Sequence, residues 1–377
     1  MNRTQRFGDT ELDVTDPGLT NERIFPLLRA FIQDTFNACT FHRERWKRAG
    51  LQDGRISSLE DFEKLPRMGP DEASIGDLHL LPDHYPAGLR GRDGLNALPP
   101  DSRLAKKFTT SGSTGKPKAV YYTAQDWRLH AAAFPRVATH IPREWMTRCF
   151  NAFNPGHIAG KFTEDCWNSH GFTVENRHFS ATTPEQVLHQ LTSGLREVGG
   201  FNFLCLPPSL PKGAVAKGIT LSDLLDLDQE NYIGSRIRVI LTTGAPRDNP
   251  EHRLKQRVWE ANELARAGKT ILFEFYGAAE VGLIAAECEH NDGLHLRPGL
   301  VFIEVIDPAT GRHVADGERG LVCVTGLHQG SRYVRYLVGD EVTFDARPCP
   351  CGAPTPKFRG MARVLDRERI RQGCAAG

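Results

Sequence analysis

The spacing of apolar residues predicts a helical region near the N-terminus. Between residues 22 and 50 apolar side chains recur at helical intervals, and Thr20-Asn-Glu in front of them is a capping signal. The positions that carry this spacing are Ile24, Leu27, Leu28, Phe31, Ile32 and Phe36. We therefore expect helix through this region, with one face packed on a core.

The middle of the chain alternates between short β-branched runs and helical stretches. The runs predicted as strands are 119–122, 203–206, 237–243 and 270–276, and the stretches predicted as helices are 184–197 and 250–266. Such alternation favours a parallel or mixed α/β sheet.

After residue 298 the pattern changes to closely spaced strands, at 300–306 and 320–325, with a turn signal at Asp307-Pro-Ala-Thr-Gly-Arg312. This pattern indicates a smaller, barrel-like β subdomain. We expect α/β subdomains over 1–298, a β-rich subdomain over 299–365 and a short tail over 366–377.

Composition narrows the functional classes. The 377 residues carry a net charge of only +1, which argues against a nucleic-acid-binding surface. No apolar run approaches the roughly 18 residues of a membrane helix, and the N-terminus lacks the apolar stretch of a signal peptide. We expect a cytoplasmic enzyme, with homodimerisation left open. Its nine cysteines are then thiols or metal ligands rather than disulfides.

Residues 108–118, Phe-Thr-Thr-Ser-Gly-Ser-Thr-Gly-Lys-Pro-Lys, form the segment with the strongest chemical character. Glycines allow close backbone approach, while hydroxyl, amide and lysine groups suit a polyphosphate. A P-loop does not fit, because Gly112 and Gly115 are only three positions apart and Pro117 follows Lys116. A solvated linker is the alternative, although Gly-Lys-Pro-Lys before a strand is not linker composition.

Four more segments follow in order: 154–160 (Asn-Pro-Gly-His-Ile-Ala-Gly), 239–246 (Val-Ile-Leu-Thr-Thr-Gly-Ala-Pro), 273–280 (Phe-Glu-Phe-Tyr-Gly-Ala-Ala-Glu) and 333–340 (Tyr-Val-Arg-Tyr-Leu-Val-Gly-Asp). With 108–118 they resemble the motifs of the adenylate-forming superfamily. Ser57–Pro66 and Cys349-Pro-Cys-Gly352 are similar to segments of its phenylacetate-CoA ligase-like branch.

The resemblance implies a large adenylation domain of mixed α/β subdomains with a small β-barrel-like subdomain. It also implies an activity: ATP and Mg²⁺ activate a carboxylic acid as an acyl-adenylate, which is then transferred to a thiol such as CoA or an acyl-carrier protein. The branch suggests an aryl or arylacetic acid. Aromatic side chains that could border its pocket are Phe150, Phe153, Phe162, Trp167 and Phe275, although core packing fits them equally. Lys161 could pair with the substrate carboxylate or face solvent.

Residue roles carry over from the matching motifs. Glu280 is the implied Mg²⁺ ligand, His157 borders the acyl pocket, Asp340 binds the ribose, and Arg363 lies near ribose and phosphate. Lys116, Glu280, His157 and Arg363 are the candidate catalytic residues. The nucleotide-binding set comprises Thr109, Ser111, Gly112, Ser113, Thr114, Gly115, Lys116, Gly244, Ala245, Pro246, Tyr276 (stacked on adenine), Gly277, Asp340 and Arg363.

The chain departs from the superfamily in two places. The usual C-terminal domain, with its catalytic lysine, does not fit into the eleven residues that follow the hinge-like Arg363 and Asp366, so the chain is either a stand-alone form or part of a longer protein. Ala279 replaces a residue whose hydroxyl touches the α-phosphate in the family. The tail loosely resembles acyl-protein synthetases, in which a cysteine accepts the acyl group. Cys374 could play that part, with nearby arginines favouring its thiolate, or it could lie in a frayed terminus. An amine-activating relative and a low-activity nucleotide- or acyl-binding protein remain alternatives.

Cys349 and Cys351 lie one residue apart before Gly352, and Cys288 and His295 form a second pair. Thiolates and imidazole are the ligands that tetrahedral Zn²⁺ prefers. The branch resemblance implies a similar pairing of segments, so we predict a structural zinc site. Unrelated loop residues or buried thiols are the alternative.

Overall fold

The computed structural model describes residues 3–76, 78–85, 98–110, 117–153, 158–176, 183–196, 202–205, 209–210, 219–220, 224, 227–228, 237–243 and 270–375. The chain divides into two compact units. Unit 1 comprises Met1–Ala133, Gly277–Ala285 and His295–Gly377, and unit 2 comprises Phe134–Tyr276 and Ala286–Leu294. The division expected at residue 298 stays a prediction.

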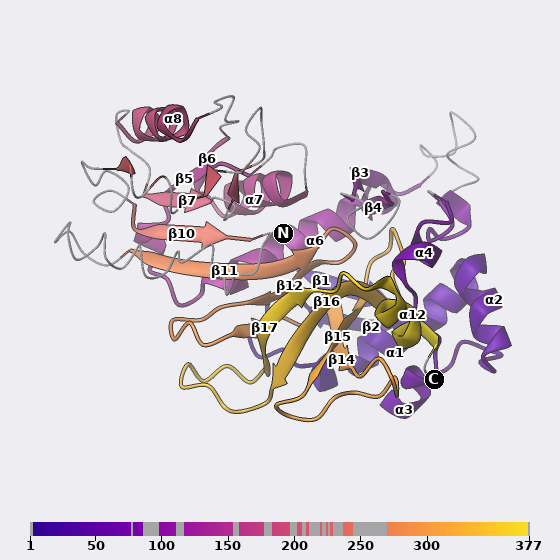
Figure 1. Cartoon of the computed structure of the whole chain (residues 1–377). Helices are drawn as coiled ribbons and strands as arrows, with labels where there is room; N and C mark the ends of the chain where they lie inside the picture. The colour runs from indigo at the N-terminus through magenta and orange to yellow at the C-terminus, as the bar shows by residue number, and fades with distance from the viewer. Residues whose placement is uncertain are drawn as a thin grey trace. The chain divides into compact units, whose positions relative to one another are not determined.

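Unit 1 holds most of the antiparallel strands (Figure 1). Its elements are β1 (Thr4–Phe7), β2 (Thr10–Asp13), α1 (Asn21–Ala38), α2 (Thr40–Arg48), α3 (Leu59–Glu63), α4 (Pro70–Ala73), η1 (Pro100–Ser102), β3 (Leu104–Thr109), β4 (Ala119–Thr123), α6 (Ala124–Ala133), β12 (Gly282–Ala286), β13 (Leu294–Leu296), β14 (Val301–Ile306), β15 (Arg319–Gly326), β16 (Tyr336–Asp345), β17 (Lys357–Arg363) and α12 (Arg367–Ala375). Strands β14, β15, β16 and β17 pair antiparallel in that order, and β13 and β12 follow. The strands predicted at 300–306 and 320–325 are confirmed, while closure into a barrel stays a prediction.

Helix α1 begins where the capping signal predicts. The Thr20 hydroxyl accepts from the Arg23 amide, and Phe31 on the apolar face of α1 belongs to the same buried cluster as Phe302 of β14. The helical region predicted over 22–50 is confirmed, and it consists of two helices. Cys39 is extended between them, and the Asp83 carboxylate accepts from the Thr40 amide at 3.0 Å, which satisfies the first turn of α2.

Unit 2 holds the parallel strands. Its elements are η2 (Phe134–Ala138), η3 (Arg143–Trp145), β5 (Arg148–Asn151), α7 (Ile158–Ser169), β6 (Thr173–Asn176), α8 (Pro184–Arg196), β7 (Phe203–Cys205), β8 (Ser209–Leu210), β9 (Ile219–Thr220), β10 (Val239–Thr242) and β11 (Ile271–Ala278). The strand order is β6-β5-β7-β10-β11, all parallel. Together with the antiparallel strands of unit 1, this sheet confirms the mixed α/β class. The helix predicted over 250–266 lies outside the described residues.

The predicted tail forms helix α12, which packs on unit 1. Ile370 joins a buried cluster with Ile306, Leu321, Cys323 and Leu337. Gly373 contacts the same strands so closely that an added Cβ would lie 2.9 Å from the Leu321 side chain. The alternative of a frayed terminus is therefore wrong for residues 367–375. No helix in the described part of the chain is long and apolar enough to cross a membrane.

Candidate nucleotide and acyl-activation site

The proposed phosphate loop is closed at its base by a hairpin. Residues 111–116 lie outside the described residues, so the positions of Ser111, Gly112, Ser113, Thr114, Gly115 and Lys116 stay untested. The ends of the loop are described: β3 and β4 pair antiparallel up to Thr109 and Ala119. The Thr110 amide donates to the Lys118 carbonyl, and the Lys118 amide donates to the Thr110 hydroxyl, both at 3.0 Å. Two hydrogen bonds thus hold the two ends of the proposed phosphate loop together.

Lys118, Glu280 and Tyr336 form a buried charged cluster within unit 1. Lys118 Nζ lies 3.1 Å from Glu280 Oε1 and 2.9 Å from the Tyr336 hydroxyl. That hydroxyl donates to the same Oε1 at 3.1 Å. The side chains of Lys118 and Glu280 are only 3% and 9% exposed. Burial, and next the Glu280 carboxylate, raise the pKa of Tyr336 well above its usual value, so its phenol keeps its proton.

Both contacts to Glu280 use Oε1. Among the described residues Oε2 has no hydrogen-bond or ion-pair partner. Oε1 is held by a cation and a hydroxyl, and Oε2 is left as an oxygen ligand of the kind that Mg²⁺ accepts. The predicted role of Glu280 therefore fits its surroundings. Lys118 and Tyr336 lie inside the matched motifs, but the sequence alone predicts no role for either of them.

The backbone before Tyr336 is held in an unusual conformation. Arg335 has a φ of +47°, a region that non-glycine residues rarely adopt, and its side chain is fully buried. Its guanidinium binds both oxygens of Glu304 at 2.8 and 3.3 Å and donates to the carbonyls of Glu63 and Leu65. These contacts offset the cost of the unusual φ of Arg335, and they hold the backbone at the point where β16 begins with Tyr336.

Asp340 and Arg363, both predicted to bind the nucleotide, face each other across β16 and β17. They are register partners, and Arg363 Nη1 donates to Asp340 Oδ1 at 2.8 Å. The same nitrogen donates to the Val338 carbonyl at 3.2 Å. The structure therefore brings together the predicted ribose acceptor and the predicted phosphate-side arginine.

Gly277 lies near the end of β11, and Glu280 lies in the tight connection between β11 and β12. A Cβ added at Gly277 would lie 2.7 Å from the Gly282 carbonyl oxygen, so glycine is needed there. The Tyr122 hydroxyl donates to the Ala279 carbonyl at 2.6 Å, which fixes this turn through its backbone where the family has a side-chain hydroxyl. Tyr276, predicted to stack on adenine, lies on β11 and is 9% exposed. His157, Gly244, Ala245 and Pro246 lie outside the described residues.

The aromatic residues considered for the acyl pocket are core residues of unit 2. Phe162, Trp167 and Phe275 each pack edge-on against Phe134, with centroid distances of 4.9 to 5.3 Å. Phe150 and Phe153 are buried as well. Lys161 pairs with Glu164 at 2.8 Å and Asp165 at 3.1 Å on α7, so its charge already has protein partners.

The predicted zinc ligands converge. One ligand atom from each of Cys288, His295, Cys349 and Cys351 lies within 4.8 Å of the others. His295 Nε2 is 3.4 Å from Cys351 Sγ, and its Nδ1 lies 3.2 Å from the Thr355 carbonyl. With the ring proton on Nδ1, donated to that carbonyl, the lone pair of Nε2 faces the cysteine sulfur, as a metal-binding histidine requires. Zn–S bonds of ~2.3 Å place tetrahedral sulfurs roughly 3.8 Å apart, so a modest contraction would complete the site.

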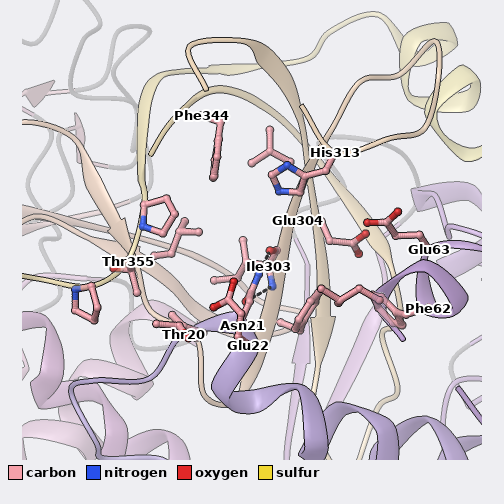
Figure 2. Close-up of a pocket in the computed structure, with 17 residues that line it drawn as sticks. Thr20, Asn21, Glu22, Phe62, Glu63, Ile303, Glu304, His313, Phe344 and Thr355 are labelled. Atoms are coloured by element: carbon pink, nitrogen blue, oxygen red, sulfur yellow. Dashed lines mark hydrogen bonds between the residues drawn. The ribbon is translucent and has the colours of Figure 1, made fainter. Parts of the chain in front are cut away.

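A cavity of about 390 Å³ lies elsewhere in unit 1, lined by the first turn of α1, by α3 and by β14 (Figure 2). Figure 2 shows the carboxylates of Glu63 and Glu304 on one side of it. Its lining includes none of the predicted nucleotide-binding residues. The cavity is therefore separate from the candidate site.

A sequence model described as "AMP-binding enzyme" matches residues 60–334, well over half of the chain. The chain belongs to this family. The matched range contains the hairpin-closed loop, Glu280 and Tyr333, and the resemblance to adenylate-forming enzymes stated from the motifs is confirmed.

Relatives of this AMP-binding family member include three proteins named phenylacetate-coenzyme A ligase. The Thermus thermophilus protein is 21% identical over 327 residues, which are 86% of this chain and 66% of that protein. The Pseudomonas putida protein is 23% identical over 83% of this chain and 64% of its own length. The Aromatoleum evansii protein is 25% identical, covering 90% and 68%. The chain thus spans about two thirds of the length of these relatives, and the phenylacetate-CoA ligase-like branch is confirmed.

The fold of this AMP-binding family member is also similar to solved structures. An open conformation of 2-hydroxyisobutyryl-CoA ligase, in complex with 2-HIB-AMP and CoA, has a TM-score of 0.69 and 20% identity, over 92% of this chain and 75% of that chain. Its thioesterification state also has a TM-score of 0.69, at 23% identity over 92% and 68%. At such identities the likeness shows the fold alone.

Proposed function

We propose that the chain activates a carboxylic acid with ATP, forming an acyl-adenylate and pyrophosphate, and transfers the acyl group to the thiol of CoA. The observation that carries the proposal is the buried Lys118–Glu280–Tyr336 cluster, whose Lys118 also closes the base of the glycine- and hydroxyl-rich loop. Membership of the AMP-binding enzyme family supports the nucleotide.

In the first step a carboxylate oxygen of the acid attacks the α-phosphorus, and the bond to the bridging oxygen breaks with release of pyrophosphate. In the second step the thiol sulfur attacks the acyl carbonyl, AMP leaves with the former carboxylate oxygen, and the thiol proton passes to solvent. The protein has to align two anions and offset their charge. We assign the phosphates to Thr109, Ser111, Ser113, Thr114 and Lys116, and the ribose to Asp340 with Arg363.

Glu280 would hold the magnesium ion through Oε2, because Oε1 is occupied by Lys118 and Tyr336. When bound, magnesium would offset negative charge as the carboxylate approaches the phosphorus. The contribution of the chain itself is a carboxylate of fixed orientation. Lys118 and Tyr336 orient that carboxylate and are positioning residues.

The acid we propose is aryl or arylacetic, supported by relatives named phenylacetate-coenzyme A ligase. The aromatic residues of unit 2 do not support it, because they are engaged in core packing. Ala279 provides no hydroxyl for the α-phosphate. Losing one charge-assisted hydrogen bond of that kind costs about 1.5–3 kcal/mol, which slows adenylation without abolishing it.

CoA is a better acceptor than Cys374. Burial, and next Glu72, raise the pKa of the Cys374 thiol to about 11, so it is protonated near neutral pH. We expected the nearby arginines to favour the thiolate, but their charges are already paired. Arg369 pairs with Glu341, and Arg371 pairs with Asp71 and Glu368. Self-acylation would first require α12 to leave its place on the β-sheet.

We also propose that Cys288, His295, Cys349 and Cys351 hold a structural Zn²⁺ ion. The donor set and the convergence of its atoms within 4.8 Å suit a closed tetrahedral site. The Ala353 amide donates to Cys351 Sγ at 3.4 Å, a contact that stabilises thiolate charge. Such an ion would tie the segment after Glu280 to the segment after Asp340 without taking part in the chemistry.

Mass spectrometry tests the reaction and its acceptor together. The protein is incubated with ATP, Mg²⁺ and a panel of aryl and arylacetic acids, with and without CoA. We expect AMP and acyl-CoA in solution only when acid and CoA are both present. An acyl adduct on the protein that disappears in Cys374→Ser would establish self-acylation instead. AMP formation that does not depend on any of the acids would contradict the proposal.

A further inference from the structure

A second cavity of unit 1 lies beside α12, away from the cluster of Lys118 and Glu280. It has a volume of about 310 Å³ and is lined by residues of α2, α4, α12 and the segment 66–69. Pro66, Pro70 and Ile370 give it apolar walls, and the half-buried Cys374 also lines it. The volume suits a small organic molecule.

Arg67 lines this cavity and is only 3% exposed, yet its guanidinium has no carboxylate partner among the described residues. Its Nε donates to the Gly373 carbonyl and its Nη1 to the Gly311 carbonyl at 2.9 Å, and its Nη2 has no partner in the described part of the chain. Burial lowers the pKa of Arg67, which reflects the cost of an unpaired buried charge. An anion in the cavity would remove that cost.

A second arginine of the lining is also incompletely satisfied. Arg45 pairs with Glu72 at 2.7 Å and donates to the Arg67 carbonyl at 3.0 Å, but its buried Nη1 has no hydrogen-bond partner. Arg45 and Arg67, two side chains of the lining, therefore each retain a donor that no described group accepts from.

The charge of the lining favours a monoanion. It contains four arginines (Arg45, Arg67, Arg367 and Arg371) and two acids (Asp71 and Glu72). Asp71 pairs with Arg371, and Glu72 pairs with Arg45. Arg67 and Arg367 therefore have no carboxylate partner among the described residues. The two carboxylates would repel a dianionic phosphate more strongly than a single carboxylate.

We propose that this cavity is a second ligand site, which binds a small organic carboxylate. The carboxylate would accept from Arg67 and Arg45, and an aromatic or aliphatic body would pack on Pro66, Pro70 and Ile370. Since Arg67 also holds the Gly373 carbonyl of α12, the bound anion would stabilise α12 in its place. This site is separate from the residues assigned to adenylation.

Alkylation of Cys374 provides a test that needs no catalytic activity. The protein, without ATP, is treated with N-ethylmaleimide, and the modification of each cysteine is followed by peptide mass spectrometry. Benzoate is the probe, and benzamide is its uncharged match. At a benzoate concentration about three times the dissociation constant, three quarters of the sites are filled, so alkylation of Cys374 should be about four-fold slower. Cys351, the other partly exposed cysteine, should be unaffected.

Three outcomes would overturn the proposal: no slowing by benzoate, equal slowing by benzamide, or slowing by inorganic phosphate but not by benzoate. The variant Arg67→Lys keeps the charge but loses the planar fork, so we expect it to weaken protection about ten-fold or more. If that variant fails to fold, the comparison of benzoate with benzamide on the wild-type protein still decides the matter. Loss of pyrophosphate exchange would not affect this readout.

Discussion

Lys118 Nζ lies 3.1 Å from Glu280 Oε1 in a part of unit 1 that is almost closed to solvent. Lys118 directly precedes β4, the strand that follows the proposed phosphate loop, and Glu280 lies in the turn between β11 and β12. This ion pair connects two motifs that are far apart in the sequence. Among the described residues, Glu280 provides the only carboxylate that pairs with Lys118.

Lys118→Met should lower acid-dependent pyrophosphate exchange about 10- to 100-fold, the loss expected for a hydrogen-bonded charge pair of about 1.5–3 kcal/mol. The carboxylate of Glu280 would lose its orientation and remain buried without a counter-charge. Initial rates of exchange at saturating ATP and acid give the measurement.

Lys106→Met is the matched control for Lys118→Met. Lys106 lies on the same hairpin and contacts the Trp127 ring at 5.3 Å. Its loss should change the rate by less than about two-fold, because Lys106 lies outside the buried cluster of Lys118, Glu280 and Tyr336. Equal rates for the two variants would show that Lys118 has no special role.

Asp340→Asn should raise the KM for ATP about ten-fold, with a smaller change in kcat. A neutral amide pairs poorly with Arg363 and is a weaker acceptor for ribose hydroxyls than a carboxylate. Exchange rates as a function of ATP concentration separate the two parameters. The neighbouring Glu341→Gln, whose carboxylate pairs with Arg319 and Arg369, should leave the KM within a factor of about two. An unchanged KM in Asp340→Asn would place the ribose elsewhere.

Much of the fold is predictable from the sequence because it depends on local patterns. The strand at Val301–Ile306, the cap at Thr20 and the alternation in unit 2 follow from side-chain period and capping chemistry. The break at Cys39 could not be predicted, since it depends on capping by Asp83, which is distant in the sequence.

In the site, too, the residues of local motifs are predictable from the sequence, whereas contacts between distant segments are not. Glu280 and Asp340 are identifiable from their motifs. Lys118 is not, because a lysine beside a phosphate loop is expected to point at phosphate. Its burial depends on Tyr336, which lies 218 residues away. For Cys374, nearby arginines predict a thiolate, whereas the packing of α12 buries the thiol and reverses the direction of the pKa shift.

Metal analysis of protein purified without chelator should find about one zinc per chain. Cys351→Ser should lose the metal and lower the Tm, since a bound ion stabilises only the folded state. Cys374→Ser, which changes a cysteine outside the cluster, should retain it. Zinc below about half an equivalent in the wild-type protein, or full retention in Cys351→Ser, would reject the site.

Acidification from pH 7 to pH 5 should destabilise the protein through buried neutral histidines. Burial lowers the pKa of His42 and of His328 to about 3, and it lowers that of His130 as well. The unfolded chain binds a proton at each near pH 6.5, so stability is full above that pH and is lost as the pH falls toward the folded values. His42 and His328 should each cost about 2 kcal/mol by pH 5.

Urea unfolding of His42→Gln at both pH values measures this effect. The amide can still donate to the Arg332 carbonyl, which His42 Nε2 contacts at 2.7 Å, but it does not titrate. The pH dependence of its unfolding free energy should therefore be weaker than that of wild type by about 2 kcal/mol. His290→Gln, an exposed position, should keep the wild-type dependence. Identical curves for all three proteins would contradict the assignment.

Acid-dependent exchange of labelled pyrophosphate into ATP is the measurement that tests the central claim most directly. With Mg²⁺ and a panel of aryl and arylacetic acids, we predict exchange that requires one of the acids and that falls at least about 100-fold in Glu280→Gln, since the amide replaces the proposed metal ligand. Glu318→Gln, on an exposed turn, should exchange like wild type. Exchange that needs no acid, or that is unchanged in Glu280→Gln, would contradict the account.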